Sequence, residues 1–415
     1  MILHWRWAVV AMHLEIVLAV GVLVALALFD IPVSFVLPVA VLAGFIGVAQ
    51  RGPIDDSPAW LLDLGVCLLL ISSLVSQQAA LSVAVAKLQT GICAVACSLY
   101  FAVRNFRRSH TLLLVLAAGG VMCYGSRGLL EFLRSYRNWS SLGFTQLADF
   151  RAFVALTPFG TPSGAANATY LSFFPLCSLA FVSLGSTYRR LRFVLLIPIT
   201  LCGVCILLSF SRGLYISAAL GVMAALYDLP RRYAYRAALC AIAFCSVLYL
   251  RHSAIGDAAL NTVSLHQTSS RRLSAINRWS FLRSGLSLIA RSPILGVGPG
   301  NFTLGLDAYS SRTTQGLTSQ PFNAFVSITV EQGLLGAIAL SAVGAGVFIL
   351  LWYFPISADP DRCAILRGGC VALVVYSLCQ AYLFADRASA ASTFLFLGLV
   401  PLEYRYATEK GRSSI

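Results

Sequence analysis

The chain has 415 residues, of which 58% are hydrophobic and only 11% charged, and its mean hydropathy is +0.81. This composition excludes a soluble globular protein, because apolar runs of about 17–25 residues recur along the chain and match the length of a membrane-crossing helix. The net charge of +14 does not indicate nucleic-acid binding, since the basic residues are dispersed among loops and form no soluble basic domain.

The sequence predicts an all-α polytopic membrane protein with about twelve transmembrane helices, forming one membrane domain over residues 1–415. The expected spans are 8–28, 31–49, 58–76, 80–103, 110–125, 165–187, 193–210, 213–228, 237–251, 323–353, 370–385 and 389–404. With both termini in the cytoplasm, sixteen basic residues fall in cytoplasmic segments. The short outer connections hold two, Arg212 and Arg387. This asymmetry is the one that the positive-inside rule requires.

Two long loops are then expected on the outer side, at 126–164 and at 252–322. In the first, GLLEFLRSYRNW has apolar residues at helical spacing, which predicts a separate short helix along the membrane interface. The second and larger loop lies between the ninth and tenth spans. It contains most of a polar stretch, Ser270–Gly336, that carries six arginines.

The run NRWSFLRSGLSLIARSPILG in the larger loop predicts an amphipathic helix. We expect it to lie on the membrane surface and to end before Pro293. Its apolar face is expected to comprise Trp279, Leu282, Leu286 and Ile289. Arg278, at its start, would be held over the membrane, whereas Arg283 and Arg291 are better explained as a basic face for anionic headgroups.

Arg212 lies in LLSFSRGLYIS, between two apolar runs too close together for a true loop. An arginine at membrane depth costs about 2.5–3.5 kcal/mol on insertion scales, so it needs a partner. Two interpretations stay open. Arg212 either snorkels to the outer headgroups or binds a phosphate group that approaches from the outer leaflet.

Other chemical motifs are weak. Cys202 and Cys205 form a CxxC within an apolar run, without a second pair, and are interpreted as packing residues, so no metal site or cofactor is predicted. GVGPGNF lacks the flanking strand and helix of a nucleotide loop and predicts a tight turn. Glu331, in VEQGLLG, either marks a proton pathway or holds a neighbouring polar group in place.

SPILGVGPGNF and FNAFVSITVEQGLLG together resemble the O-antigen ligase and O-antigen polymerase family of bacterial envelope glycosyltransferases. In that family an arginine precedes a Pro-x-x-Gly-x-Gly turn, and a His-Asn pair leads into a helix with Glu-x-Gly-x-x-Gly. Arg278 matches this arginine, and SRG at 211–213 makes Arg212 the counterpart of the family's other arginine. The remaining matches are Pro293, Gly296, Gly298, Gly300, Asn323, Glu331, Gly333 and Gly336.

The resemblance implies a metal-independent glycosyltransferase of the bacterial inner membrane, with its active site on the periplasmic face. Its donor would be a glycan on undecaprenyl pyrophosphate, and its acceptor another glycan, lipid A core or a protein. Arg212 and Arg278 would be the catalytic residues that bind the pyrophosphate. Further substrate-binding residues would be Arg271, Arg272, Gly298, Asn301, Asn323 and Glu331. Besides these partners we expect membrane lipid and no nucleic acid.

The chain departs from the family at Phe322, where a histidine usually precedes the asparagine. Phenylalanine accepts no proton, so His266 and Asp307 are candidate substitute bases, and the departure slightly favours a polymerase over a ligase. Two other functional classes stay open. One is a transporter or flippase of a lipid-linked or anionic substrate, and the other is an inactive scaffold of an export complex.

Overall fold

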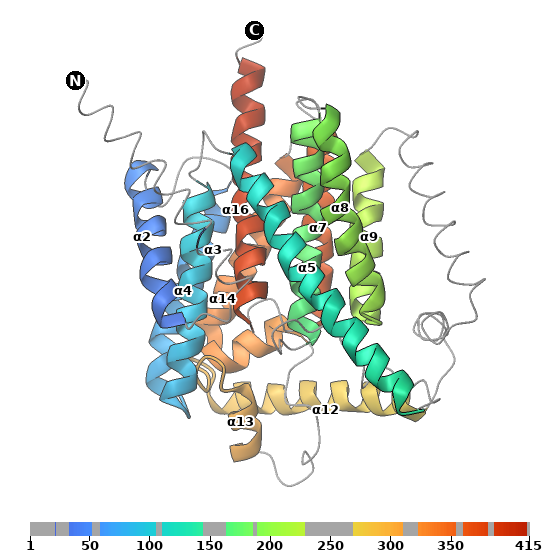
Figure 1. Cartoon of the computed structure of the whole chain (residues 1–415). Coiled ribbons are helices and arrows are strands. Elements are labelled where there is room, and N and C mark those ends of the chain that lie inside the picture. Colours follow the sequence, from blue (N-terminus) through green and yellow to red (C-terminus); the bar gives the residue numbers. More distant parts are fainter. Residues whose placement is uncertain are drawn as a thin grey trace. The chain divides into compact units, whose positions relative to one another are not determined.

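The computed structural model describes residues 21, 33–51, 59–104, 110–143, 163–185, 189–228, 269–309, 323–353, 360–380 and 386–412. Every secondary-structure element in these ranges is a helix, and no strand occurs among them. The chain divides into two compact units. Their helices are labelled in Figure 1. The all-helical class predicted from hydropathy is therefore confirmed.

The first unit comprises Met1–Leu113, Thr268–Phe354 and Ser377–Ile415. Its helices are α2 (Val33–Arg51), α3 (Trp60–Ser76), the 3-10 helix η1 (Gln77–Ala79), α4 (Val83–Arg104), α12 (Ser269–Arg291), α13 (Phe302–Tyr309), α14 (Ala324–Tyr353) and α16 (Arg387–Arg412).

Within this unit α3 packs along α14, and α4 packs along α2 and α16. The α3–α14 contact is close because of glycine. A Cβ at Gly65 would lie 2.5 Å from the backbone nitrogen of Val343, and one at Gly346 would lie 2.5 Å from that of Leu62. Small residues allow membrane helices to pack backbone to backbone in this way. α12 runs crosswise to α3 and α4 (Figure 1) and packs against α13 and α14.

The second unit comprises Leu114–Gln267 and Pro355–Tyr376. It holds most of α5 (His110–Ser141), α7 (Ser163–Gly185), α8 (Arg189–Leu208), α9 (Arg212–Asp228) and most of α15 (Pro360–Cys379). α7 packs along α8, and the Tyr376 hydroxyl of α15 donates to the Gly164 carbonyl of α7 at 2.7 Å. Cys202 and Cys205 are both buried in this unit, as expected of packing residues.

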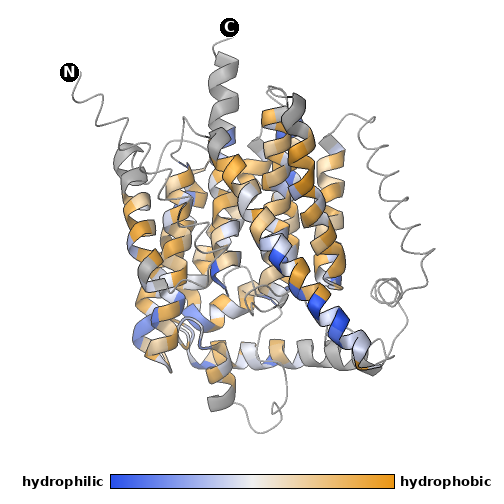
Figure 2. Cartoon of the chain, in the orientation of Figure 1, coloured by the Kyte–Doolittle hydropathy of each residue, from blue (hydrophilic) through white to orange (hydrophobic). Residues whose placement is uncertain are grey.

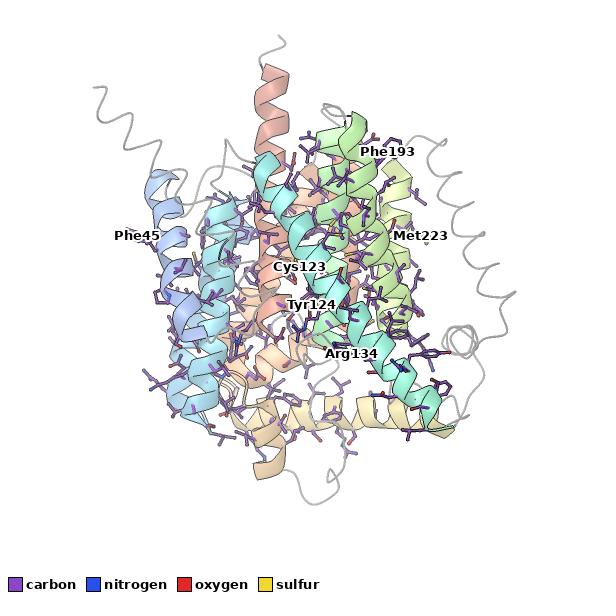
Figure 3. All side chains as sticks on the ribbon, in the orientation of Figure 1. Phe45, Cys123, Tyr124, Arg134, Phe193 and Met223 are labelled. Atoms are coloured by element: carbon purple, nitrogen blue, oxygen red, sulfur yellow. The ribbon has the colours of Figure 1, made fainter. Side chains whose placement is uncertain are left out.

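Six described helices are long and apolar enough to cross a membrane: Trp60–Ala79, Val83–Arg104, Leu113–Ser141, Gly164–Leu184, Ala324–Trp352 and Pro360–Cys379. Shorter apolar helices cover Val36–Phe45, Phe193–Leu208 and Arg212–Tyr227. Large apolar side chains such as Phe45, Phe193 and Met223, which are 69%, 73% and 65% exposed, suit contact with lipid (Figure 3). The count of twelve spans stays a prediction, because 237–251 and all but Gly21 of 8–28 lie outside the described residues.

Three predicted boundaries are wrong: those of α5 and α15, and the end of α16, which runs to Arg412 where a span ending at 404 was expected. α5 is a single helix to Ser141, where a span ending at 125 and a separate interfacial helix were expected. No proline interrupts this stretch, and its hydropathy falls along one unbroken helix (Figure 2). α15 begins at Pro360 rather than at 370, because proline suits the first helical position and Asp361 complements the positive N-terminal end of the helix.

A buried ion pair joins α3 to α4. The Arg104 Nη2 atom lies 2.5 Å from the Asp63 Oδ2 atom, and neither side chain is exposed to solvent. The Tyr100 hydroxyl donates to the other carboxylate oxygen at 2.7 Å. Arg104 was expected in a cytoplasmic segment, and the structure places it at the last residue of α4 with its charge neutralised inside the unit.

Candidate functional site

α12 ends at Arg291, before Pro293, as predicted. Phe281, Gly285 and Leu288 are buried and form the face that contacts the unit. Trp279 and Leu286, from the predicted apolar face, are 69% and 56% exposed. The helix therefore has an apolar flank against protein and an adjacent exposed apolar flank, as a helix at a membrane surface requires.

α14 is broken at Gly333 (φ 64°, ψ −155°), inside its apolar span. Three successive carbonyls before the break have donors outside the helix: Val330 accepts from the Val297 N–H (2.9 Å), Glu331 from the Gly298 N–H (2.9 Å) and Gln332 from the Ser76 hydroxyl (3.3 Å). After the break, the Leu334 N–H donates to the Pro293 carbonyl at 2.8 Å. Irregular backbone at membrane depth is tolerated only with such partners.

Glycines of the GVGPGNF turn and of the helix signature in α14 are needed where the turn contacts the broken helix. A Cβ at Gly333 would lie 2.1 Å from the Ile294 carbonyl oxygen, and one at Gly298 (φ 93°) would lie 2.5 Å from the Ala80 Cα atom. Both residues have positive φ, which glycine adopts without steric cost. The predicted tight turn is therefore confirmed, and the turn and the helix signature form one interlocked structure.

Glu331 caps α13. Its carboxylate accepts a hydrogen bond from the Gly300 N–H at 2.9 Å and one from the N–H of Phe302, the first residue of α13. A carboxylate at a helix N-terminus satisfies unpaired donors and complements the helix dipole. The interpretation that Glu331 holds a neighbouring polar group in place is confirmed by this geometry. Substrate binding by Glu331 stays a prediction.

Asn301 joins the turn to the start of α4. Its Oδ1 atom accepts from the Ser82 N–H at 3.0 Å, and its Nδ2 atom donates to the carbonyls of Ser82 (3.3 Å) and Pro299 (3.1 Å). The side chain is fully buried. These contacts hold the backbone of two segments far apart in sequence, and they leave the predicted contact with substrate without support from geometry.

Apolar side chains fill the space between the turn and the helices. Phe281 and Leu288 of α12, Val297 of the turn, Phe302 and Leu306 of α13, and Val330 of α14 form one buried cluster. The hydrogen bonds at the break are therefore shielded from solvent, where each is stronger than in water.

Gln332 was missed by the sequence analysis. Its Oε1 atom accepts from the Ser72 hydroxyl at 2.6 Å, while its backbone carbonyl accepts from Ser76. All three residues are buried. The available signal was the spacing of Ser72 and Ser76, which lie four apart on one face of an apolar helix and so required a polar partner in another helix.

Asn323 is the N-cap of α14. Its Oδ1 atom accepts from the N–H groups of Phe325 (2.9 Å) and Val326 (3.1 Å). Its Nδ2 atom donates to the Leu378 carbonyl at 3.3 Å, and both residues belong to the first unit. Asn323 is thus a structural capping residue. Glu331 lies eight residues after Asn323, about 12 Å further along the axis of α14.

Arg212 is the first residue of α9 and is exposed. The turn before it contains Phe210, a non-glycine residue with positive φ (51°), whose ring centroid lies 6.5 Å from that of Phe132 in α5. The Tyr215 hydroxyl donates to the Leu207 carbonyl and ties α9 back to α8. An arginine at a helix N-terminus opposes the helix dipole.

For the remaining candidate site residues, the structure describes the backbone only or nothing. Arg271, Arg272 and Arg278 lie in α12, and Asp307 lies in α13, with their backbones described. His266 and Phe322 lie outside the described residues. Gly298, Asn301 and Glu331 are brought together in the first unit, whereas Arg212 belongs to the second. In the part of the chain that is described, no group of three His, Cys, Asp or Glu side chains is arranged to hold a metal ion.

The fold and this site define a helical membrane protein in which a glycine-rich turn is inserted against a broken membrane helix. Residues 193–341 match the family model described as O-antigen ligase. The matched segment includes both arginine motifs, the turn and the break in α14. The match supports assignment of the chain to the O-antigen ligase family and confirms the resemblance found in the sequence. No curated protein matches the chain.

Proposed function

We propose that the chain is a glycosyltransferase that moves or polymerises oligosaccharide from an undecaprenyl-pyrophosphate donor onto an acceptor hydroxyl, at the periplasmic face of the bacterial inner membrane. The observation that carries this proposal is the family match over residues 193–341, which includes Arg212, Arg278 and the interlocked turn.

The chemistry suits arginine. When the glycosidic bond breaks, the pyrophosphate leaving group gains negative charge. A guanidinium group is always protonated and grips two phosphate oxygens at once. Arg212 begins α9, where the first N–H groups of the helix also favour an anion. We therefore assign Arg212 and Arg278 to the pyrophosphate, with Arg271 and Arg272 as further substrate-binding residues on α12.

Phe322 favours a polymerase, whose acceptor is another lipid-linked glycan, over a ligase that acts on lipid A core or a protein. If the glycosidic bond is largely broken before the acceptor attacks, little basicity is required of the group that takes the acceptor proton. His266 and Asp307 are the candidate bases for this proton. Variants of each that retain transfer would exclude that residue.

The break in α14 is a feature of transporters, in which unwound carbonyls bind an ion or substrate. Here the carbonyls of Val330, Glu331 and Gln332 are hydrogen-bonded to the protein's own turn and to Ser76. The break therefore serves to seat the turn, and we favour the transferase over the flippase.

The test uses purified protein in liposomes with undecaprenyl-pyrophosphate oligosaccharide and an acceptor glycan. A transferase releases undecaprenyl pyrophosphate and lengthens the acceptor, a flippase moves donor between leaflets without either, and a scaffold does neither. Arg212→Ala and Arg278→Ala are each expected to lower kcat by about 100- to 1000-fold. Lysine at either position should restore little, because it binds phosphate oxygens one at a time.

The matched control is Arg134→Ala, which removes the same charge from an exposed helix surface, where Arg134 is 73% exposed. It should keep the wild-type rate. Full activity in Arg212→Ala or Arg278→Ala, with the control also active, would remove that arginine from the site.

A further inference from the structure

The Glu331 carboxylate constrains the junction between the glycine-rich turn and α13. It holds the N–H of Gly300 (φ 71°) at 2.9 Å and that of Phe302. The side chain is partly buried and lies one residue after Val330, a member of the apolar cluster. One carboxyl group that accepts two nearby backbone N–H groups fixes the backbone between them.

The side chain of Phe302 carries this constraint to α12. The ring centroids of Phe281 and Phe302 lie 6.5 Å apart, and both side chains are buried. Gly285, one turn along α12, allows close approach to α14. A Cβ there would lie 2.9 Å from the Cγ1 atom of Val326. Phe281 is three residues from Arg278, on the adjacent turn of the same helix. A continuous path of contacts therefore leads from Glu331 to the turn of α12 that bears Arg278.

We propose that Glu331 is a positioning residue for glycosyl transfer. It holds Phe302, and Phe302 holds the part of α12 that carries Arg278, so Glu331 contributes to the reaction without touching the substrate. This inference rests on the proposed function of Arg278 and replaces the substrate-binding role expected of Glu331. Small displacements of a catalytic group cost up to about 100-fold in rate, which is why such support matters.

The experiment compares Glu331→Ala, Glu331→Gln and Phe281→Leu in liposomes. The readouts are hydrogen exchange of the Gly300 and Phe302 amides, kcat, KM for the donor and the pH profile of kcat. Thr329→Ala is the matched control, because Thr329 lies on the same segment of α14 and its hydroxyl donates to Phe325 of its own helix.

Glu331→Ala is expected to speed exchange at both amides by about tenfold and to lower kcat by about 10- to 100-fold, with a smaller change in KM. Glu331→Gln keeps an acceptor oxygen and is expected to restore both readouts to within about threefold, with an unchanged pH profile. Phe281→Leu interrupts the path further along. It should lower kcat while leaving Gly300 protected, and combining it with Glu331→Ala should add little.

Two results would overturn the proposal. One is a Glu331→Gln variant as inactive as Glu331→Ala with both amides still protected, which would mean that the carboxylate acts on the substrate. The other is normal exchange and normal kcat in Glu331→Ala. A wild-type protein that releases no undecaprenyl pyrophosphate would instead refute the proposed function, and the exchange data would still show whether Glu331 fixes the turn.

Discussion

Asn301, Asn323 and Glu331 have one property in common: each side chain is hydrogen-bonded to backbone of its own chain. Asn301 holds the glycine-rich turn, Asn323 caps α14, and Glu331 caps α13. Arg212 differs from them because it begins a helix whose dipole it opposes. The motif residues therefore separate into those whose side chains hold the backbone of the turn and helices and those, such as Arg212, that do not cap a helix.

Asn323→Ala is expected to destabilise the protein by about 0.5–2 kcal/mol, because the N–H groups of Phe325 and Val326 lose their acceptor. Asn323→Asp keeps this acceptor and should keep most of the stability. The measurement is the midpoint of unfolding in detergent. An aspartate variant that unfolds normally but transfers no glycan would show that the amide also binds substrate, whereas an alanine variant of wild-type stability would refute the capping role.

At the scale of elements, the break in α14 and the turn that fills it are a single structure. The helix gives up its own hydrogen bonds at Gly333, and the turn supplies replacements from Val297 and Gly298. Inside the membrane, neither the turn nor the broken part of α14 could satisfy the hydrogen-bonding groups of its backbone alone.

Gly333→Ala is expected to cost at least about 2 kcal/mol, because the new Cβ combines a strained positive φ with a contact 2.1 Å from the Ile294 carbonyl. Gly344→Ala, on the same helix, is the matched control. A Cβ there meets nothing within 4 Å, so the change should stabilise the protein by about 0.5–1 kcal/mol. The measurement is the unfolding midpoint of each variant. Equal shifts of the midpoint in Gly333→Ala and Gly344→Ala would contradict the close contact described at Gly333.

The buried ion pair between Asp63 of α3 and Arg104 of α4 leads to a separate prediction. Arg104→Met leaves the buried Asp63 carboxylate without its partner and is expected to cost about 3–5 kcal/mol. Adding Asp63→Asn removes the stranded charge but keeps an acceptor for the Tyr100 hydroxyl, so about half of the loss should return.

Arg134→Met, which breaks the exposed 3.5 Å pair with Glu131, should cost less than about 1 kcal/mol. Denaturation curves of the single and double variants test the buried pair. A double variant no more stable than Arg104→Met would argue that the charge of Asp63 is not what makes the single change costly.

For the whole molecule, hydropathy alone was enough to predict the membrane class and most helix positions, because the cost of exposing backbone to lipid permits few alternatives. The boundaries of α5, α15 and α16 differ from the prediction because polar residues alone do not end a helix, which continues wherever nothing breaks it. The break at Gly333 was not predicted either, since glycine is common inside regular membrane helices.

The site was predicted in part. Its motif residues were found by resemblance, but the pairing of Glu331 with Gly300, or of Asn301 with Ser82, joins segments 31 and 219 residues apart in sequence. No local pattern encodes such contacts. The spacing of Ser72 and Ser76 indicates that a polar partner is needed but does not identify it as Gln332, because Ser72 and Gln332 lie 260 residues apart.

The order along the chain of the groups that satisfy the break in α14 bears on how the protein is synthesised and inserted into the membrane. Ser76, Pro293, Val297 and Gly298, which satisfy the groups freed at Gly333, all precede that glycine in the sequence. During synthesis each of them leaves the ribosome before α14 does. The broken helix therefore enters the bilayer when its docking partners already exist, and its irregular segment need never face lipid alone.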